Sequence, residues 1–347
     1  MSSSKTSTAI LAKARAMYGK CLTDKDYDEL MECHTVSEVA AYLKTRTNYA
    51  SVLTGLNEND VHRGQLEPLL RQNIYFDVTA LSRYGQNVNI SSSFSDFIIS
   101  KMEIEQIMRC LTLMNIGKPQ EYVYSVPLSL DKFTSINLRG LATVKTYDDV
   151  LEVLKGTKYF SVLQKFKPKD EEKIQIADLE VQLTNEQYGR LFQAISKAKN
   201  KSDREESKDI FSAILDFENV SRILRLKKYY NFSAEQIKGK LIPYGKLSDK
   251  IINELCSADT VQDVFERSRS TYLGKLMAKL QYNDLTQIKN SMLSMYCKHH
   301  LRLSANPTIV MVSYIYLKEL ELTNIINIIE ATRYGISASE KAKLLVR

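Results

Sequence analysis

The sequence predicts an all-α fold, and three observations lead to this prediction. Glycine and proline are sparse, with 12 and 6 among 347 residues, so long stretches contain no residue that would break a helix. Apolar residues recur with the spacing of an amphipathic helix in several segments. A helix-start motif also appears three times at intervals of about 110 residues, which indicates three related helical modules.

The helix-start motif is a threonine followed three residues later by an acid. The threonines are Thr35, Thr146 and Thr260, and the acids are Glu38, Asp149 and Asp263. The threonine oxygen can accept from the N–H of the third residue, and the acid there can accept from the threonine's own N–H. Each threonine also has a leucine five residues before it and a valine four residues after it. We therefore predict three equivalent helix starts.

A second repeated pattern predicts one long amphipathic helix near the end of each module. Segments starting near residues 102, 215 and 319 each contain an acid, an amide three residues later and then an aliphatic residue. The acid and amide are Asp216 and Asn219 in the middle copy, and Glu321 and Asn324 in the last. The first copy departs from the pattern, with Gln106 in place of asparagine. We expect these pairs to make contacts between helices or, as the alternative, to bind a partner.

The repeats divide the chain into three predicted modules, 1–120, 121–242 and 243–347. After the second and third long helices, Asn231 and Gly335 can adopt the left-handed conformation that ends a helix. Ser233 and Ser337 can then cap a further short helix. The modules are expected to lie around a pseudo-threefold axis or in a curved row.

Composition argues against binding of nucleic acid and against a membrane span. The net charge of +7 arises from 48 basic and 41 acidic residues that are mixed along the chain, as on an ordinary solvated surface. The most apolar run, 309–317, is far shorter than the roughly 20 residues that a span needs. The first twenty residues lack the apolar segment of a signal peptide, and five scattered cysteines suit a reduced, intracellular chain.

No motif supports catalysis or cofactor binding. The chain contains no phosphate-binding loop, no G-x-S-x-G, no H-E-x-x-H and no C-x-x-C. Cys297, His299 and His300 are too close together along a helix to share one face, so we do not expect a metal site there. Cys33 and His34 have no third catalytic partner nearby. We expect no catalytic residue, no cofactor and no metal.

The last long helix and its surroundings resemble a known family. Residues 317–337 resemble the last-helix motif of the C subunit of bacterial and archaeal V/A-type ATPases, which is related to the d subunit of the eukaryotic V-ATPase. That motif is K-x-x-E-x-x-N-I, and Lys318, Glu321 and Asn324 occupy its polar positions. Residues 213–225 resemble the motif of the middle repeat, and 255–264 resemble the third helix start. The matching residues of the middle repeat are Asp216, Asn219 and Arg222.

The resemblance implies a funnel-shaped, mostly helical protein of three similar domains. Members of this family lie on the cytoplasmic face of the membrane rotor ring and join it to the central stalk. The implied role is a non-catalytic connecting subunit that transmits torque, with stalk subunits and the proteolipid ring as partners and only peripheral membrane contact. From the residues alone, a helical scaffold of another complex is the alternative, followed by a nucleic-acid-binding protein.

Overall fold

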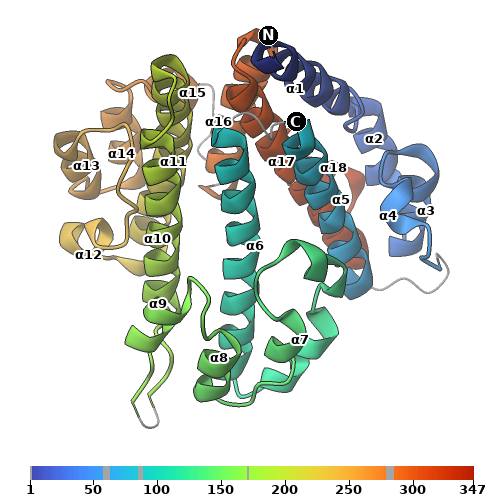
Figure 1. Ribbon diagram of the computed structural model, residues 1–347, viewed down its shortest axis with the longest axis horizontal. Coiled ribbons are helices and arrows are strands. Elements are labelled where there is room, and N and C mark those ends of the chain that lie inside the picture. Colours follow the sequence, from blue (N-terminus) through green and yellow to red (C-terminus); the bar gives the residue numbers. More distant parts are fainter. Residues whose placement is uncertain (1, 58–62, 85–88, 170–171, 279–284) are drawn as a thin grey trace.

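A computed structural model describes residues 2–57, 63–84, 89–169, 172–278 and 285–347. These residues form helices joined by short connections, and none of them lies in a strand, so the predicted all-α fold is confirmed (Figure 1). The long helices are α1 (Ser2–Tyr18), α5 (Arg63–Tyr84), α6 (Asn89–Asn115), α10 (Ile176–Ser196), α11 (Lys201–Tyr230), α16 (Leu285–Leu303) and α17 (Pro307–Arg333).

Short helices form three groups between the long ones. The first group is α2 (Asp24–Glu32), α3 (Val36–Arg46) and α4 (Ala50–Leu53). The second is η2 (Pro119–Ser125), η3 (Leu128–Phe133), α7 (Leu138–Leu141), α8 (Tyr147–Val153) and α9 (Phe160–Lys165). The third is α12 (Ala234–Lys238), α13 (Asp249–Cys256), α14 (Val261–Ser268) and α15 (Gly274–Met277), and α18 (Ala338–Ala342) follows the last long helix.

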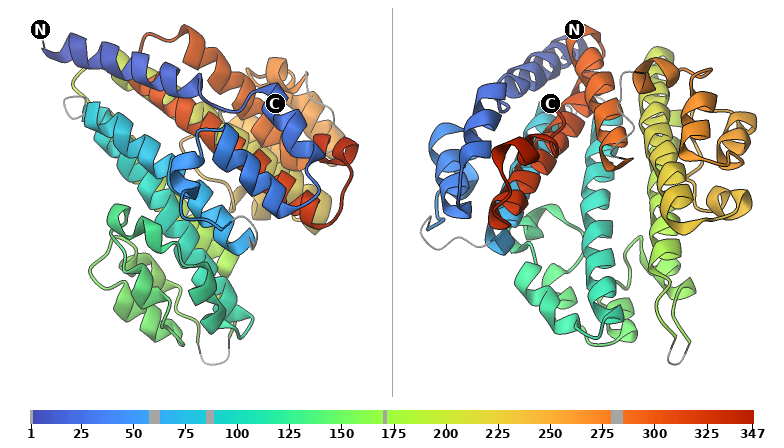
Figure 2. Two further views of the ribbon diagram at one scale, coloured as in Figure 1. Left: turned by 90° about the vertical axis from the view of Figure 1, so that its right-hand side faces the viewer. Right: turned by 180° about the vertical axis from the view of Figure 1, so that it is seen from behind.

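The long helices occupy the centre of the molecule, and the short groups lie on three sides of it. Figure 1 shows α2–α4 at the right, α12–α14 at the left, and α7 and α8 at the bottom. The view from behind in Figure 2 shows the same separation. The pseudo-threefold, funnel-shaped arrangement of equal modules stays a prediction.

Helix α17 is the most deeply buried element. It packs against α1, α5, α11 and α16 as well as the first short group. All residues from Thr308 to Lys318 are buried, because this half of the helix is apolar on nearly every face. The apolar stripe predicted for its second half is present as buried Leu322, Ile325 and Ile329. This helix therefore lies at the centre of the hydrophobic core.

The three threonines of the repeated motif are N-caps. The hydroxyls of Thr35, Thr146 and Thr260 accept from the N–H three residues on, at 3.1, 3.2 and 3.1 Å. At Thr146 and Thr260 the acid also accepts from the threonine's own N–H, which completes the capping box. At Thr35 this second bond differs, since Glu38 accepts from the N–H of His34 at 2.7 Å.

Replacing Thr146 with alanine is expected to lower the free energy of unfolding by about 1 kcal/mol, because the first turn of α8 loses its side-chain cap. Urea denaturation measures this effect. Thr45→Ala is a matched control, since Thr45 lies exposed inside α3 and its hydroxyl bonds only to the carbonyl of Ala41. Alanine favours the helix interior there. Equal losses from both substitutions would contradict the capping assignment.

The first short group contacts the C-terminal residues of the sequence as well as α5 in its own range. The Lys341 ammonium is buried and donates to the carbonyls of Met31 and Cys33, at 2.9 and 2.7 Å. Arg347 forms an ion pair of 2.9 Å with Asp28. Contacts of the predicted module 1–120 therefore extend into the predicted module 243–347, and the division into three modules stays a proposal.

Among the described residues, no helix carries an apolar stretch sufficient to cross a membrane.

Candidate functional site

The first short group is fixed to α17 by a buried carboxylate. Glu321 accepts the hydroxyl of Tyr49 at 2.9 Å, the N–H of Leu22 at 2.6 Å and the ammonium of Lys318 at 2.6 Å. The side chains of Lys318 and Glu321 are 0% and 4% exposed. The Lys318 ammonium also lies 4.2 Å from the centre of the Tyr49 ring. A buried ion pair is therefore built into the contact between α17 and the first short group.

The second short group is fixed to α6 in a comparable way. Glu103 accepts the hydroxyl of Tyr159 at 2.5 Å and the N–H of Ser135 at 2.6 Å. The Lys158 ammonium lies 3.1 Å from the same carboxylate. Burial alone would raise the pKa of Glu103, but the bonds from Tyr159 and Ser135 and the charge of Lys158 hold that pKa below its ordinary value.

The third short group is fixed to α11 by the carboxylate of Asp216. Its Oδ2 atom accepts the hydroxyl of Tyr272 at 2.8 Å and the N–H groups of Lys246 and Leu247 at 2.8 and 2.9 Å. Within the described part of the chain, no lysine or arginine forms an ion pair with Asp216, since the Lys246 ammonium pairs with Asp209. Burial raises the pKa of Asp216 to about 6, against the lowering effect of these hydrogen bonds.

The three contacts share one arrangement. In each, a tyrosine that follows a helix-start threonine by 12 to 14 positions donates its hydroxyl to an acid on a long helix. Tyr49, Tyr159 and Tyr272 recur in the sequence with the helix-start motif, as packing residues would, and their bonds to the carboxylates are an additional finding. The acid positions of the second pattern are thereby used to attach the short groups to the long helices.

Replacing Gly245 with alanine is expected to destabilise the fold by about 1 to 3 kcal/mol. A Cβ atom at this position would lie 2.1 Å from Oδ1 of Asp216, so either the loop or the carboxylate must move. Gly55→Ala is the control, because a Cβ atom there meets nothing within 4 Å. Thermal unfolding of the two variants compares them, and an unchanged melting temperature for Gly245→Ala would refute the close approach.

The amide positions hold backbone segments in place. Asn219 donates to the carbonyl of Ile242 at 2.8 Å and accepts from its N–H at 3.0 Å. Asn324 makes the same two bonds with Val346, at 2.8 and 3.0 Å. In the first copy, Gln106 instead accepts a tyrosine hydroxyl at 3.1 Å. The departure from asparagine at this position therefore coincides with a different partner.

The candidate positions for contact or interface are mostly enclosed. The buried members are Asp216, Asn219, Lys318, Glu321 and Asn324. Their bonds are internal, and none of these five is free to reach a partner in this conformation. Arg222 differs, since its guanidinium donates to the carbonyl of Lys240 at 2.6 Å and also lines an open cleft.

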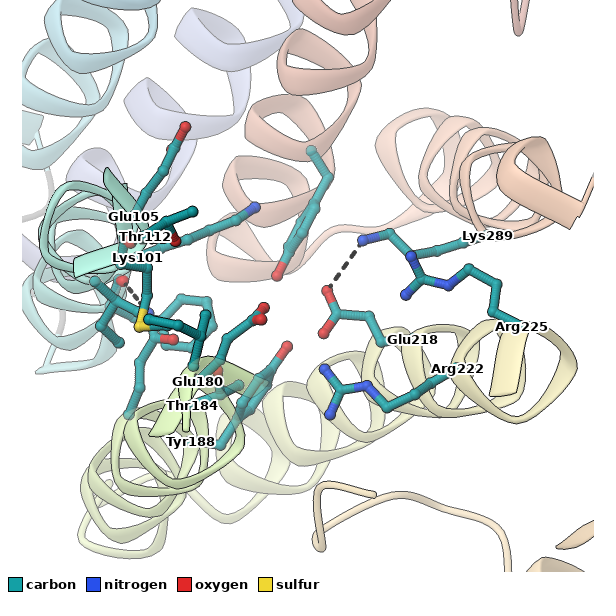
Figure 3. A pocket seen from close by; sticks show the side chains of 16 residues that line it. Lys101, Glu105, Thr112, Glu180, Thr184, Tyr188, Glu218, Arg222, Arg225 and Lys289 are labelled. Atoms are coloured by element: carbon teal, nitrogen blue, oxygen red, sulfur yellow. Dashed lines mark hydrogen bonds and ion pairs between the residues drawn. The ribbon is translucent and has the colours of Figure 1, made fainter. Parts of the chain in front are cut away.

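The open cleft lies at the centre of the bundle and has a volume of about 450 Å³. Its walls come from α6, α10, α11, α16 and α17. Both walls carry charged side chains. Figure 3 shows Glu105, Glu180 and Lys101 on the α6 and α10 side, and Arg222, Arg225, Lys289 and Glu218 on the α11 and α16 side.

Some charges of the cleft are already paired. Lys289 lies 3.5 Å from Glu218, and Arg71 lies 3.5 Å from Glu105. Arg225 and Glu180 are exposed and form no ion pair with any residue that the structure describes. Neither residue stands out in the sequence, because each resembles an ordinary solvated residue of an amphipathic helix.

The described residues form an all-helical protein with a charged central cleft that a partner could enter. Side chains of the described residues form no cluster suited to holding a metal ion. The chain belongs to the ATP synthase (C/AC39) subunit family, whose model matches residues 10–343. The predicted resemblance to the C subunit family of V/A-type ATPases is thereby confirmed.

Curated relatives agree with this family. The chain is 25% identical over 336 residues to the A-type ATP synthase C subunit of Methanosarcina mazei, which covers 94% of this chain and 89% of the relative. It is 25% identical over 265 residues to the protein of the same name from Pyrococcus horikoshii, and the match covers 76% of this chain and 67% of the relative. The Pyrococcus abyssi protein of that name is 24% identical over 275 residues, and this match covers 78% of this chain and 69% of the relative.

Proposed function

We propose that this chain is the non-catalytic subunit that connects the central stalk of a rotary ATPase to its membrane ring and transmits torque between them. Family membership supports the assignment to such a complex. The relatives carry the name of the C subunit of A-type ATP synthases. The proposed location is peripheral, on the cytoplasmic face of the ring, with stalk subunits and the proteolipid ring as partners.

The central cleft is the observation on which the proposal rests. Its walls include the three long helices α6, α11 and α17, each of which also holds one short group through a buried carboxylate. A force applied inside the cleft would therefore be passed to every part of the frame. Exposed charges on two walls give an incoming stalk segment groups to bind.

The close packing of the frame suits a torque coupler, which must not deform under load. Protein interiors are packed at the density of organic crystals, so they transmit strain with little compression. The tyrosine–carboxylate contacts add directional bonds at three separated places. No reaction centre is needed for this role.

Binding assays with the purified chain test the proposal. We expect it to capture the stalk subunits and, separately, the detergent-solubilised rotor ring of the same ATPase. Circular dichroism must show that the chain is folded. A folded chain that captures neither partner would contradict the proposed function. In complexes stripped of this chain, ATP hydrolysis should no longer drive ion transport, and adding the chain back should restore it.

A further inference from the structure

We infer that the stalk segment entering the cleft is the tip of a helix that carries both signs of charge, with a cation facing Glu180 and an anion facing Arg225. This inference rests on the proposed function and adds the chemistry of the contact.

The size of the cleft limits what can enter. An α-helix about 10 Å wide rises about 5.4 Å per turn, so each turn occupies about 420 Å³. The cleft has a volume of about 450 Å³. About one turn is therefore of a size that fits within the cleft, such as the end of a helix or of a helical hairpin.

Both lysines that line the cleft already form ion pairs. Lys101 lies 2.6 Å from Glu319, and Lys289 lies 3.5 Å from Glu218. Burial alone would raise the pKa of Glu218, but the nearby cations, Lys289 first, hold it below its ordinary value. These groups already have partners of opposite charge, so they offer little to an incoming chain.

Charge remains available on the two opposite walls. Glu180 on α10 is exposed and forms no ion pair within the described ranges, and Glu105 on α6 has only the 3.5 Å contact with Arg71. Across the cleft on α11, Arg225 is exposed and likewise unpaired among those residues. Figure 3 shows the acidic pair on one side and the α11 arginines on the other.

Opposite charges on opposite walls would fix the rotational position of the bound tip. A tip with complementary charges binds in one orientation, and turning it by half a revolution brings like charges together. Such a contact resists slippage about the stalk axis, which is the motion a torque coupler must prevent. The same pattern accelerates association at low ionic strength and loses this effect as salt screens it.

Charge reversal tests the inference with purified stalk subunits and the full chain. We expect Arg225→Glu and Glu180→Lys each to slow association about tenfold at low salt, with less than about a twofold difference near 0.5 M salt. Lys208→Glu and Glu186→Lys are the controls. They lie on the same two helices, are exposed and do not line the cleft, and they change the net charge equally.

The milder substitutions Arg225→Gln and Glu180→Gln should slow association with the stalk by a smaller factor. They provide the test if the charge-reversed variants do not fold. The inference would be overturned if the wild-type chain binds the stalk but the cleft variants slow association no more than the control variants do. The proposed function would then still stand. A folded wild-type chain that does not bind the stalk would instead overturn the proposed function.

Discussion

Replacing Glu321 with glutamine is expected to lower the free energy of unfolding by about 3 to 5 kcal/mol at neutral pH. Glutamine keeps the shape of the side chain and an oxygen for the Tyr49 hydroxyl or the N–H of Leu22. It removes the charge that compensates Lys318, whose side chain is fully buried. The cost is therefore that of an ammonium ion left without a counter-charge inside the protein.

One contact of the Lys318 ammonium limits the size of this effect. The cation–π contact with the ring of Tyr49 offsets part of the loss. Equilibrium denaturation with urea, followed by circular dichroism, gives the difference from the wild-type chain.

Two further variants separate the buried charge from other causes. Glu152→Gln removes the acid of an exposed ion pair with Lys155 that has the same spacing along the chain, and it should have little effect. Adding Lys318→Met to Glu321→Gln should recover most of the lost stability, because no unpaired charge then remains. If Glu321→Gln were as mild as Glu152→Gln, the buried pair would not be holding the first short group in place.

The sequence predicted the features whose chemistry is local. A helix start depends on a threonine and an acid within four residues, as at Thr146 and Asp149. The same holds for the stop after α11, where Asn231 adopts a left-handed conformation and Ser233 caps the next helix. Repetition of these local signals made the prediction strong.

Long-range attachments could not be predicted in this way. Tyr49 and Glu321 are separated by 272 residues, and no local preference links them. The pattern identified both positions but not the contact between them. The central cleft was missed for a related reason. Glu180 and Arg225 come from different helices, and only the packing of α10 and α11 brings them to one site.

Because of Asp216, the stability of the folded chain is expected to fall as pH rises. A carboxylate held by a cation has the opposite effect. The pKa of an aspartate is about 3.9 in an unfolded chain, and burial raises that of Asp216 to about 6 in the fold. The folded state therefore binds more protons between these values. Its stability decreases as pH rises through this window, and the loss is complete above the higher value.

Asp216→Asn isolates this contribution, because asparagine does not titrate. Between pH 4 and pH 7 the wild-type chain should lose about 2 to 3 kcal/mol relative to Asp216→Asn, as measured by urea denaturation at a series of pH values. The titratable groups that act on Asp216 are Tyr272 and Lys246, and the Lys246 ammonium is already paired with Asp209. A difference between the two chains that stays constant across this range would show that Asp216 does not titrate there.

Glu103→Gln provides the comparison of opposite sign. The pKa of Glu103 is held below its ordinary value, so its contribution to stability is present above the unfolded pKa and disappears as pH falls through the folded one. The wild-type chain should therefore gain relative to Glu103→Gln as pH rises. The two carboxylates make similar hydrogen bonds. They differ in that the Lys158 ammonium lies 3.1 Å from Glu103, whereas Lys246, the cation that acts on Asp216, forms its ion pair with Asp209. Opposite slopes for the two variants would therefore identify the neighbouring cation, rather than the tyrosine, as the group that keeps such a contact ionised.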